Sequence, residues 1–342
     1  DLEELGQIGR DPNTGGITRP GFSKIDFEAR EWLRGKASDA GLSSFVDAAG
    51  NVIIRMDGGA PDAGRPSVIM GSHIDTVQQG GMFDGTVGVM AGLECLRVFS
   101  ENNIQTEHPL EVIAFSEEEG RFGGMMGVMA FTGALEQGWI DTVKDSKGIA
   151  LCDELRNVGL DPKAVLSARR DPAHVKAYVE LHIEQGPVLD HKQEDIGIVT
   201  HISGICDWQV SLTGEANHSG STPMAMRKDA LAGLADFISR YDDILETYGA
   251  AHSNITVGEV RVIPGYAHVV PGQVDFAVSV RDTDQAVMTR LKTGCEKTLS
   301  DVAAKHDLSL DIADKAWVLP AQCSDMVIDA VQNEVSALGY KG

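Results

Sequence analysis

Short apolar runs alternate with helical periodicity between residues 67 and 115, and this alternation most constrains how the chain folds. The apolar runs 67–70 and 110–115 predict two buried strands, and residues 89–99 between them carry apolar side chains at helical spacing. A strand–helix–strand order implies a largely parallel sheet with helices on both faces. Chemistry in such sheets gathers at the carboxyl ends of the strands.

The apolar rhythm changes after residue 205. It predicts the order strand, helix, strand, strand, helix, strand, which closes one antiparallel four-stranded sheet with two helices on one face. We therefore predict a domain of residues 206–316 inserted into a larger domain of residues 1–205 and 317–342. The predicted strands are 208–212, 255–262, 274–280 and 308–312, and the predicted helices are 230–241 and 287–302.

Charge and composition exclude several partners. The 342 residues include 51 acidic and 29 basic side chains, for a net charge of -22, which argues against nucleic acids and anionic membrane surfaces. No apolar run reaches the roughly 18 residues of a membrane-spanning helix. The five cysteines are scattered without a C-x-x-C pair, so we expect free thiols and a cytoplasmic location.

Two polar clusters follow the first predicted strand. His73 precedes Asp75 by two residues, which suits a metal-binding imidazole with a carboxylate partner that fixes its tautomer. A hydrogen-bonded turn histidine is the alternative. Asp84 lies among glycines, where its two oxygens could bridge two cations, although an ordinary Asp turn explains the same pattern.

Two further clusters contain carboxylates. Glu117, Glu118 and Glu119 directly follow the second apolar strand; a solvated charge run is the alternative, but their place at a strand end favours a site that holds cations. In residues 178–187, His182 and two glutamates alternate with apolar residues, which predicts a strand with the polar groups on one face. That arrangement suits a metal ligand and its orienting groups, or an exposed edge strand.

The second predicted domain adds two more candidates. His218 lies among small polar residues and could present its imidazole to a substrate oxygen. Arg281 lies near the end of a predicted strand, where its guanidinium could bind a carboxylate through two hydrogen bonds. The chain order His, Asp, Glu-Glu, His is typical of a two-metal hydrolase with one spare carboxylate as base.

With these segments in view, the chain resembles the M20 metallopeptidase family, and within it the amidase/hydantoinase-carbamoylase branch. That branch includes N-carbamoyl-L-amino-acid hydrolases, β-ureidopropionase and allantoate amidohydrolase. The resemblance runs from about residue 5 to the end of the chain, and it is specific for the family but weak for the substrate. The segments that carry it are 71–75, 81–85, 115–120, 180–186 and 217–224.

The resemblance implies a zinc-peptidase-like domain with a mixed sheet, and an inserted ferredoxin-like lid that also forms a homodimer interface. It implies two divalent ions per subunit, Zn²⁺ or Mn²⁺, although Co²⁺ or Ni²⁺ would also suit the ligands. By motif position, Asp84 would bridge the two ions. The other implied ligands are His73, Glu119 and His182.

The resemblance also implies roles around the metals. Glu118 would be the general base, and Asp75 the carboxylate behind a metal ligand. His218, usually from the other subunit, would polarise the substrate carbonyl. Arg281 would bind the substrate α-carboxylate, and Gln185 would lie near the substrate.

One position departs from the branch. His268 stands where the branch usually has an asparagine that helps to hold the carboxylate, so we expect the substrate acid to differ from the common ones. The implied reaction is hydrolysis of a linear amide or ureido C–N bond in a small anionic N-carbamoyl or ureido amino acid. The alternatives are an M20-type aminoacylase or dipeptidase, and a non-catalytic dimer that binds small acids with a decayed metal site.

The branch carries one further metal-binding histidine in a Ser-Gly-Ala-Gly-His-like motif after the lid. No such motif precedes Gly342 in this sequence. We therefore expect the native polypeptide to continue beyond Gly342 and to supply that histidine.

Overall fold

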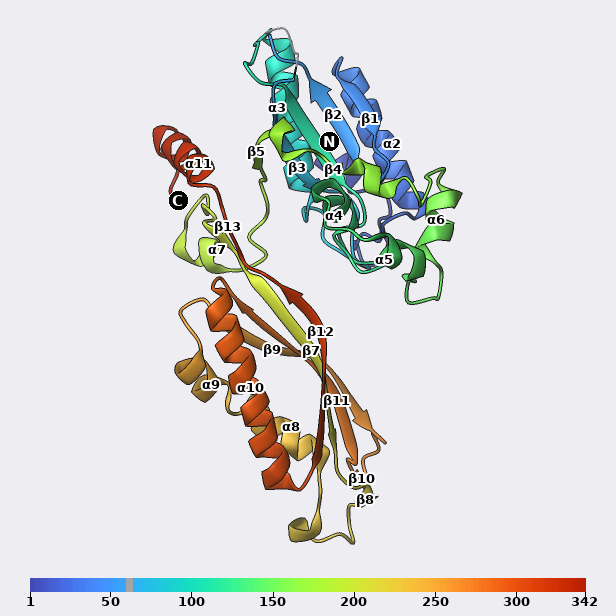
Figure 1. Cartoon of the computed structure of the whole chain (residues 1–342), viewed down its shortest axis with the longest axis vertical. Helices are drawn as coiled ribbons and strands as arrows, with labels where there is room; N and C mark the ends of the chain where they lie inside the picture. Colours follow the sequence, from blue (N-terminus) through green and yellow to red (C-terminus); the bar gives the residue numbers. More distant parts are fainter. Residues whose placement is uncertain (60–63) are drawn as a thin grey trace. The chain divides into compact units, whose positions relative to one another are not determined.

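The computed structural model describes residues 1–59 and 64–342, and the chain forms two compact units (Figure 1). Unit 1 comprises Asp1–Gln193 and unit 2 comprises Glu194–Gly342. The division into domains 1–205 with 317–342 and 206–316 stays a prediction. Within the described ranges, no helix is both long and apolar enough to cross a lipid bilayer.

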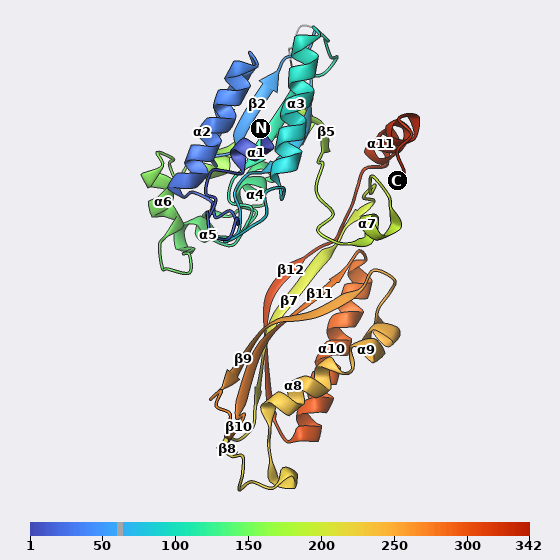
Figure 2. The same cartoon turned by 180° about the vertical axis from the view of Figure 1, so that it is seen from behind.

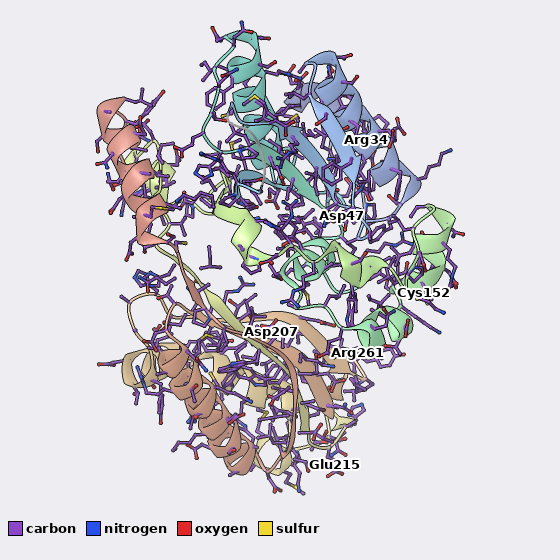
Figure 3. All side chains as sticks on the ribbon, turned by 45° about the horizontal axis from the view of Figure 1, so that its top comes forward. Arg34, Asp47, Cys152, Asp207, Glu215 and Arg261 are labelled. Carbon is purple, nitrogen blue, oxygen red and sulfur yellow. The ribbon has the colours of Figure 1, made fainter. Side chains whose placement is uncertain are left out.

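Unit 1 contains a five-stranded sheet in the order β1-β2-β4-β3-β5. The β4–β3 and β3–β5 pairs are parallel, whereas β1–β2 and β2–β4 are antiparallel. The sheet is therefore mixed, as the family resemblance implies. The apolar pattern alone predicted a largely parallel sheet, and this was wrong because β1 and β2 form a hairpin and β2 runs antiparallel to β4. Asp47 closes its turn by accepting the amides of Ala49 and Asn51, both at 2.9 Å (Figure 3). The strands are β1 (Ser43–Val46), β2 (Val52–Met56), β3 (Ser67–His73), β4 (Leu110–Phe115) and β5 (Val175–Val179).

Helices cover both faces of this sheet, as the sequence predicts. Alternate residues of a strand point to opposite faces. Val52 and Val112 pack with α2 and α3 on one face (Figure 2), whereas Ile53 and Ile113 pack with Phe131 of α4 on the other. The helices are α1 (Leu2–Leu5), α2 (Lys24–Asp39), α3 (Thr86–Glu101), α4 (Met126–Thr132), α5 (Gln137–Thr142), α6 (Leu151–Asn157) and α7 (Val188–Lys192).

Unit 2 contains an antiparallel four-stranded sheet in the order β12-β7-β11-β9. Three helices bury one face of it around Trp208 and Phe276 (Figure 1). Asp229 and Asp284 accept amides at the starts of two of these helices. The predicted helix 230–241 is two helices. The elements are β7 (Gly204–Thr213), α8 (Ala230–Ile238), α9 (Tyr241–Tyr248), β9 (Asn254–Ile263), β11 (Gln273–Asp282), α10 (Gln285–His306) and β12 (Ser309–Val318).

Short paired strands flank this sheet on both sides. At one end of the unit, β6 pairs with β13, so the segments just before β7 and just after β12 run side by side. At the other end, β8 pairs with β10. The remaining elements of unit 2 are β6 (His201–Ile202), β8 (Asn217–His218), β10 (Val269–Val270), β13 (Ala321–Gln322) and α11 (Asp325–Ala337).

All five cysteines are free, as the sequence predicts. Cys206 and Cys295 lie in the core of unit 2, and burial raises the pKa of these thiols to about 11 and about 12, respectively. Cys152 lies on α6 and is half-buried (Figure 3). The two core thiols are therefore protonated at neutral pH and serve as apolar packing.

Candidate metal centre

The candidate site lies where β3 and β4 end. These neighbouring strands are parallel, and His73 at the end of β3 pairs with Phe115 at the end of β4. Parallel strands bring their carboxyl ends to the same edge of a sheet. The loop after β3 therefore lies beside the acidic residues that follow β4.

His73 is buried and held in one tautomer. Its Nδ1 lies 3.0 Å from the backbone carbonyl oxygen of Asp75. A carbonyl can only accept, so Nδ1 carries the proton and Nε2 keeps a free lone pair. Gly85, at φ +67°, packs against the ring, and a Cβ at this position would collide with the imidazole. The orientation of the ring thus depends on a glycine that the sequence alone did not single out.

Three potential metal ligands converge here. One ligand atom each from His73, Asp84 and His182 lies within 4.8 Å of the others. His182 Nε2 is 3.2 Å from Asp84 Oδ1, while His182 Nδ1 donates to the Ile183 carbonyl at 2.7 Å. In the neutral ring, both histidines therefore carry the proton on Nδ1 and leave Nε2 free, which is the form that binds a metal ion.

Gln185 also reaches this cluster. Its side-chain amide donates to both carboxylate oxygens of Asp84, at 2.8 and 2.9 Å. This contact agrees with the expectation that Gln185 lies near the site. Its role toward a substrate stays a prediction.

Asp75 contacts both candidate acids through its carboxylate. Its oxygens accept the backbone amides of Glu118 and Glu119, at 3.3 and 3.0 Å. Its Oδ1 is 3.8 Å from His73 Nδ1, farther than the hydrogen bond from that nitrogen to the Asp75 carbonyl oxygen. Asp75 therefore orients His73 mainly through its backbone, while its carboxylate fixes the acidic loop. The sequence predicted the residue but not this division between its atoms.

Glu118 and Glu119 differ in their surroundings. Glu118 Oε2 is buried and has no hydrogen-bond partner among the described residues. Burial raises the pKa of Glu118 to about 7; His73 opposes this rise and Asp75 adds to it. Glu119 Oε1 is 4.0 Å from His73 Nε2, and burial raises the pKa of Glu119 as well. Both carboxylates lie in a setting that disfavours uncompensated negative charge.

Glu117 holds the acidic loop in shape. It is fully buried at φ +55°, and its carboxylate accepts the amides of Phe122 at 2.6 Å and Gly124 at 3.2 Å. Burial raises the pKa of Glu117 to about 7. The sequence pattern placed Glu117 with Glu118 and Glu119 in a candidate cation site, but the Glu117 carboxylate binds the backbone amides of its own loop instead.

The predicted strand over residues 178–187 was wrong. β5 ends at Val179, because its pairing with β3 ends at Met70. The Tyr178 hydroxyl then lies 2.8 Å from Glu180 Oε2, and the chain continues without regular pairing. Glu184 accepts two amides at the start of α7 and so has a structural partner of its own.

The donor set of this centre suits divalent cations. Two histidine Nε2 atoms and the carboxylates of Asp84 and Glu119 converge, and the unpartnered oxygen of Glu118 lies in the same acidic loop. Imidazole and carboxylate together favour Zn²⁺, Mn²⁺ or a similar ion. Such an ion would also compensate the charge of these acids.

The predicted residues of unit 2 fall into two groups. His218 and His268 are neighbours, since Ser219 donates its amide to the His268 carbonyl at 3.0 Å and His218 pairs with Val269. Arg281 is exposed near the far end of β11, opposite Ile205.

Within one chain, Arg281 is therefore remote from His268. From Gln273 to Arg281, β11 makes eight residue-to-residue steps, or about 26 Å at about 3.3 Å per residue. We expect from the family resemblance that His268 and Arg281 both hold the substrate carboxylate, but the strand separates them within a single subunit.

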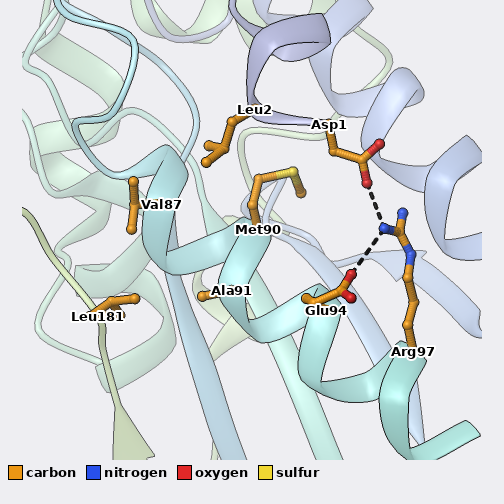
Figure 4. Close-up of a pocket in the computed structure, with 8 residues that line it drawn as sticks. All are labelled: Asp1, Leu2, Val87, Met90, Ala91, Glu94, Arg97 and Leu181. Carbon is orange, nitrogen blue, oxygen red and sulfur yellow. Dashed lines mark hydrogen bonds and ion pairs between the residues drawn. The ribbon is translucent and has the colours of Figure 1, made fainter. Parts of the chain in front are cut away.

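A separate depression of about 620 Å³ lies against α3 (Figure 4). Ion pairs of Arg97 with Asp1 and Glu94 border it. Its lining includes no histidine, and it does not form part of the metal centre. The lining residues are Asp1, Leu2, Val87, Met90, Ala91, Glu94, Arg97 and Leu181.

Comparison with known proteins adds an independent line of evidence. Residues 69–341 match the model of peptidase family M20/M25/M40. An N-carbamoyl-L-amino acid amidohydrolase of Geobacillus stearothermophilus is 37% identical over 342 residues, covering 99% of this chain and 82% of the relative. An allantoate deiminase of Arabidopsis thaliana is 33% identical, covering 92% of this chain and 65% of the relative.

A solved structure extends the likeness to the fold. An amidase of the hydantoinase/carbamoylase family from Burkholderia multivorans superposes with a TM-score of 0.88 at 32% identity. The match covers 99% of this chain and 81% of that one. Sequence and fold therefore agree on the same group of relatives.

Proposed function

Since the chain belongs to peptidase family M20/M25/M40, we propose that it is a metal-dependent amidohydrolase acting on a small N-carbamoyl or ureido amino acid. The bond cleaved is a linear C–N bond other than a peptide bond. The observation that carries this proposal is the convergence of His73, Asp84 and His182 within 4.8 Å. The named activities of its relatives, on N-carbamoyl-L-amino acids and allantoate, support the substrate class.

Our proposal includes two divalent ions, with Zn²⁺ or Mn²⁺ preferred and Co²⁺ or Ni²⁺ acceptable. His73, Asp84, Glu119 and His182 would hold them, with Asp84 between the two. When bound, such ions lower the pKa of a water molecule and polarise a carbonyl group. The Nε2 lone pairs of both histidines support this ligand set.

In this proposal Glu118 is the general base. Its carboxylate takes a proton from the attacking water and passes it to the leaving nitrogen. A pKa of about 7 suits a group that must gain and lose a proton near neutral pH. Asp75 keeps the base in place by binding the amides of Glu118 and Glu119.

In this proposal, His218, His268, Arg281 and Gln185 also have substrate-binding roles. His218 would donate a hydrogen bond to the carbonyl oxygen, and a donor of this kind contributes about 3–4 kcal/mol to transition-state stabilisation. Arg281 would bind the substrate carboxylate with its planar guanidinium, and His268 would assist there. For a carbamoyl substrate the products are an amino acid, carbon dioxide and ammonia.

The distance between these groups supports a homodimer in this proposal. His218 pairs with Val269, ahead of the Gln273 end of β11, and Arg281 lies near the other end of that strand. The strand between Gln273 and Arg281 alone is about 26 Å long. A small amino-acid derivative is far shorter than this distance. We therefore infer that His218 and His268 of one subunit and Arg281 of the other share one substrate.

Residues 206–316 would form a ferredoxin-like lid that carries the dimer interface, inserted into a catalytic domain of residues 1–205 and 317–342. The β6–β13 pair supports the insertion, because the segments entering and leaving the sheet are hydrogen-bonded neighbours. β9 supports the interface, since it is a ten-residue strand at the edge of its sheet and is largely exposed. Long exposed edges of this kind favour pairing with another chain.

Substrate assays test the activity. The purified protein, stripped of metal and then given Mn²⁺ or Zn²⁺, is supplied with N-carbamoyl amino acids, β-ureidopropionate, allantoate, N-acyl amino acids and dipeptides. We expect metal-dependent release of ammonia from a carbamoyl or ureido compound. Release of amino acid only from acyl or peptide substrates would instead establish an aminoacylase or dipeptidase. No metal binding and no turnover would establish a non-catalytic dimer.

Two further measurements test the assembly and location. Mass photometry should give twice the monomer mass of 36.6 kDa, and a monomer at concentrations that support turnover would exclude the shared site. We also propose a cytoplasmic location, supported by five free thiols. Recovery of the protein from an oxidising compartment would contradict it.

A further inference from the structure

The segment 217–227, here the His218 loop, is exposed but well organised. Met224 and Met226 are 77% and 71% exposed, so little apolar packing holds the loop in shape. Its hydrogen bonds converge instead on Arg227, which is half-buried. The Arg227 guanidinium donates from Nη2 to the Ser219 carbonyl at 2.6 Å and from Nε to the Thr222 carbonyl at 3.1 Å.

These two carbonyls flank the turn that carries His218. Thr222 donates both its amide, at 3.1 Å, and its hydroxyl, at 2.8 Å, to the His218 carbonyl. The Ser219 amide donates to the His268 carbonyl at 3.0 Å. Arg227 thus connects both histidines to one hydrogen-bonded turn.

The turn also fixes the protonation of the His218 ring. His218 Nδ1 accepts the Gly220 amide at 3.1 Å, and the Ser221 hydroxyl lies 3.3 Å from the same nitrogen. A backbone amide can only donate, so Nδ1 carries no proton and the neutral ring is protonated at Nε2. His73 and His182 have the opposite tautomer, since their Nδ1 atoms donate to carbonyls.

We propose that Arg227 is a positioning residue that locks the His218 loop, and thereby keeps His218 in the tautomer that directs an Nε2–H outward. The identity of the acceptor, a substrate carbonyl oxygen, rests on the proposed function; the tautomer does not. Lysine is not equivalent here, because a point charge cannot bind two carbonyls in the fixed geometry of a guanidinium.

Nitrogen NMR of the full chain, labelled with ¹⁵N-histidine, tests the tautomer directly. The His218 signals are assigned by their loss in His218→Gln. We expect the Nε2–H tautomer in the unaltered protein and a mixture of tautomers in Arg227→Gln. Thr222→Val, which removes only a hydroxyl, should shift the His218 signals in the same direction. An unchanged Nε2–H tautomer in both variants would overturn the proposal, whatever the enzyme's substrate.

Kinetics provide the second readout. In Arg227→Gln we expect kcat to fall about 10²-fold, the effect typical of a misplaced catalytic group, with metal content unchanged. Arg227→Lys should recover part of this loss. The control is Arg240→Gln, which removes a half-buried arginine of the same unit whose hydrogen bonds go to Asp236; it should leave kcat and the His218 tautomer unchanged. An equal loss of kcat in the control would also overturn the proposal.

Discussion

The two units differ in how many charged side chains they bury. Among the described residues, unit 1 buries six charged side chains at 2% exposure or less, whereas unit 2 buries one, Asp282. The core of unit 2 is built from apolar strand and helix residues. The six charged residues of unit 1 are Arg19, Asp26, Arg30, Asp75, Glu111 and Glu117.

Buried charges rarely add net stability, because desolvation offsets the attraction between partners. In unit 1 they instead fix segments around the metal centre. Arg19 donates from Nε to the Ile74 carbonyl at 2.6 Å, next to Asp75, and Glu117 closes the acidic loop. The core of unit 2 contains few buried charges of this kind, because its candidate residues lie at the exposed ends of its sheet. Buried charges therefore hold the candidate site residues in place in unit 1, whereas surface turns hold them in place in unit 2.

The largest expected effect is loss of metal from unit 1. Asp84→Ala should remove most bound metal, because one carboxylate serves both ions in our proposal. Metal content is measured by mass spectrometry after dialysis. Asp11→Ala, which alters a half-buried aspartate of the same unit outside the candidate ligand set, is the control. Full occupancy in Asp84→Ala would exclude a bridging role.

Glu118→Gln should lower kcat by about 10²–10⁴-fold, the range for a lost general base, while both metals stay bound. The amide keeps the shape of the side chain but cannot take a proton. Turnover and metal content are measured on the same preparation. Near-normal turnover would refute the assignment.

Glu111→Gln tests whether buried charge stabilises unit 1. Glu111 accepts from Arg170 at 3.0 Å and from Ser67 at 2.9 Å. Burial alone would raise the pKa of Glu111, but Arg170 and its other partners outweigh burial and lower it. We expect a loss of about 3–5 kcal/mol in the free energy of unfolding at pH 7, because the partner arginine is left uncompensated.

The sign of the pH dependence follows from that lowered pKa. The ionised Glu111 stabilises the fold fully above its ordinary pKa of 4.5, and this contribution is lost as pH falls through the lowered value. The difference between Glu111→Gln and the unaltered protein should therefore shrink below pH 4.5. Leu212→Ala in the core of unit 2 should lower the free energy of unfolding by about 2–5 kcal/mol both at pH 7 and below pH 4.5. Denaturant titration measures the loss of unfolding free energy in both variants, and hydrogen exchange assigns each loss to its unit. If the loss in Glu111→Gln did not change with pH, this account would be contradicted.

The smallest effect is expected at the exposed end of unit 2. Arg281→Lys should raise KM about tenfold, since one charge-assisted hydrogen bond is worth about 1.5 kcal/mol or more, and leave kcat nearly unchanged. A substrate with an amidated carboxylate should be insensitive to the substitution. Equal KM values for free and amidated substrates in the unaltered protein would refute the carboxylate contact.

Periodicity predicted the buried elements well and the edges poorly. β4 occupies the predicted residues, because its side chains are buried on both faces and the apolar run marks its length. Residues 178–187 alternate as a strand would, yet β5 stops pairing with β3 at Val179, although β3 itself continues to His73. The point at which an edge strand leaves its sheet is therefore not encoded in its own apolar alternation.

The sequence predicted which residues form the candidate site, but not which of their atoms make the contacts. Strand ends and residue types were enough to bring His73, Asp84 and His182 into one hypothesis, and the structure groups them. Whether His73 contacts the carbonyl or the carboxylate of Asp75 depends on the conformation of the loop, which the spacing of the two residues does not encode. In the same way, the twelve residues between His268 and Arg281 include most of a strand, whose length the spacing alone does not reveal.

The length of β11 has a genetic consequence. If a site takes His218 from one subunit and Arg281 from the other, two defective copies of the gene can rescue each other. A mixed dimer of one protein lacking His218 and one lacking Arg281 would hold one intact site and one doubly defective site. Random assembly would restore roughly a quarter of the sites. Alleles altered at the same end of the strand would show no such complementation, so the order of residues along β11 could be mapped by crossing mutants.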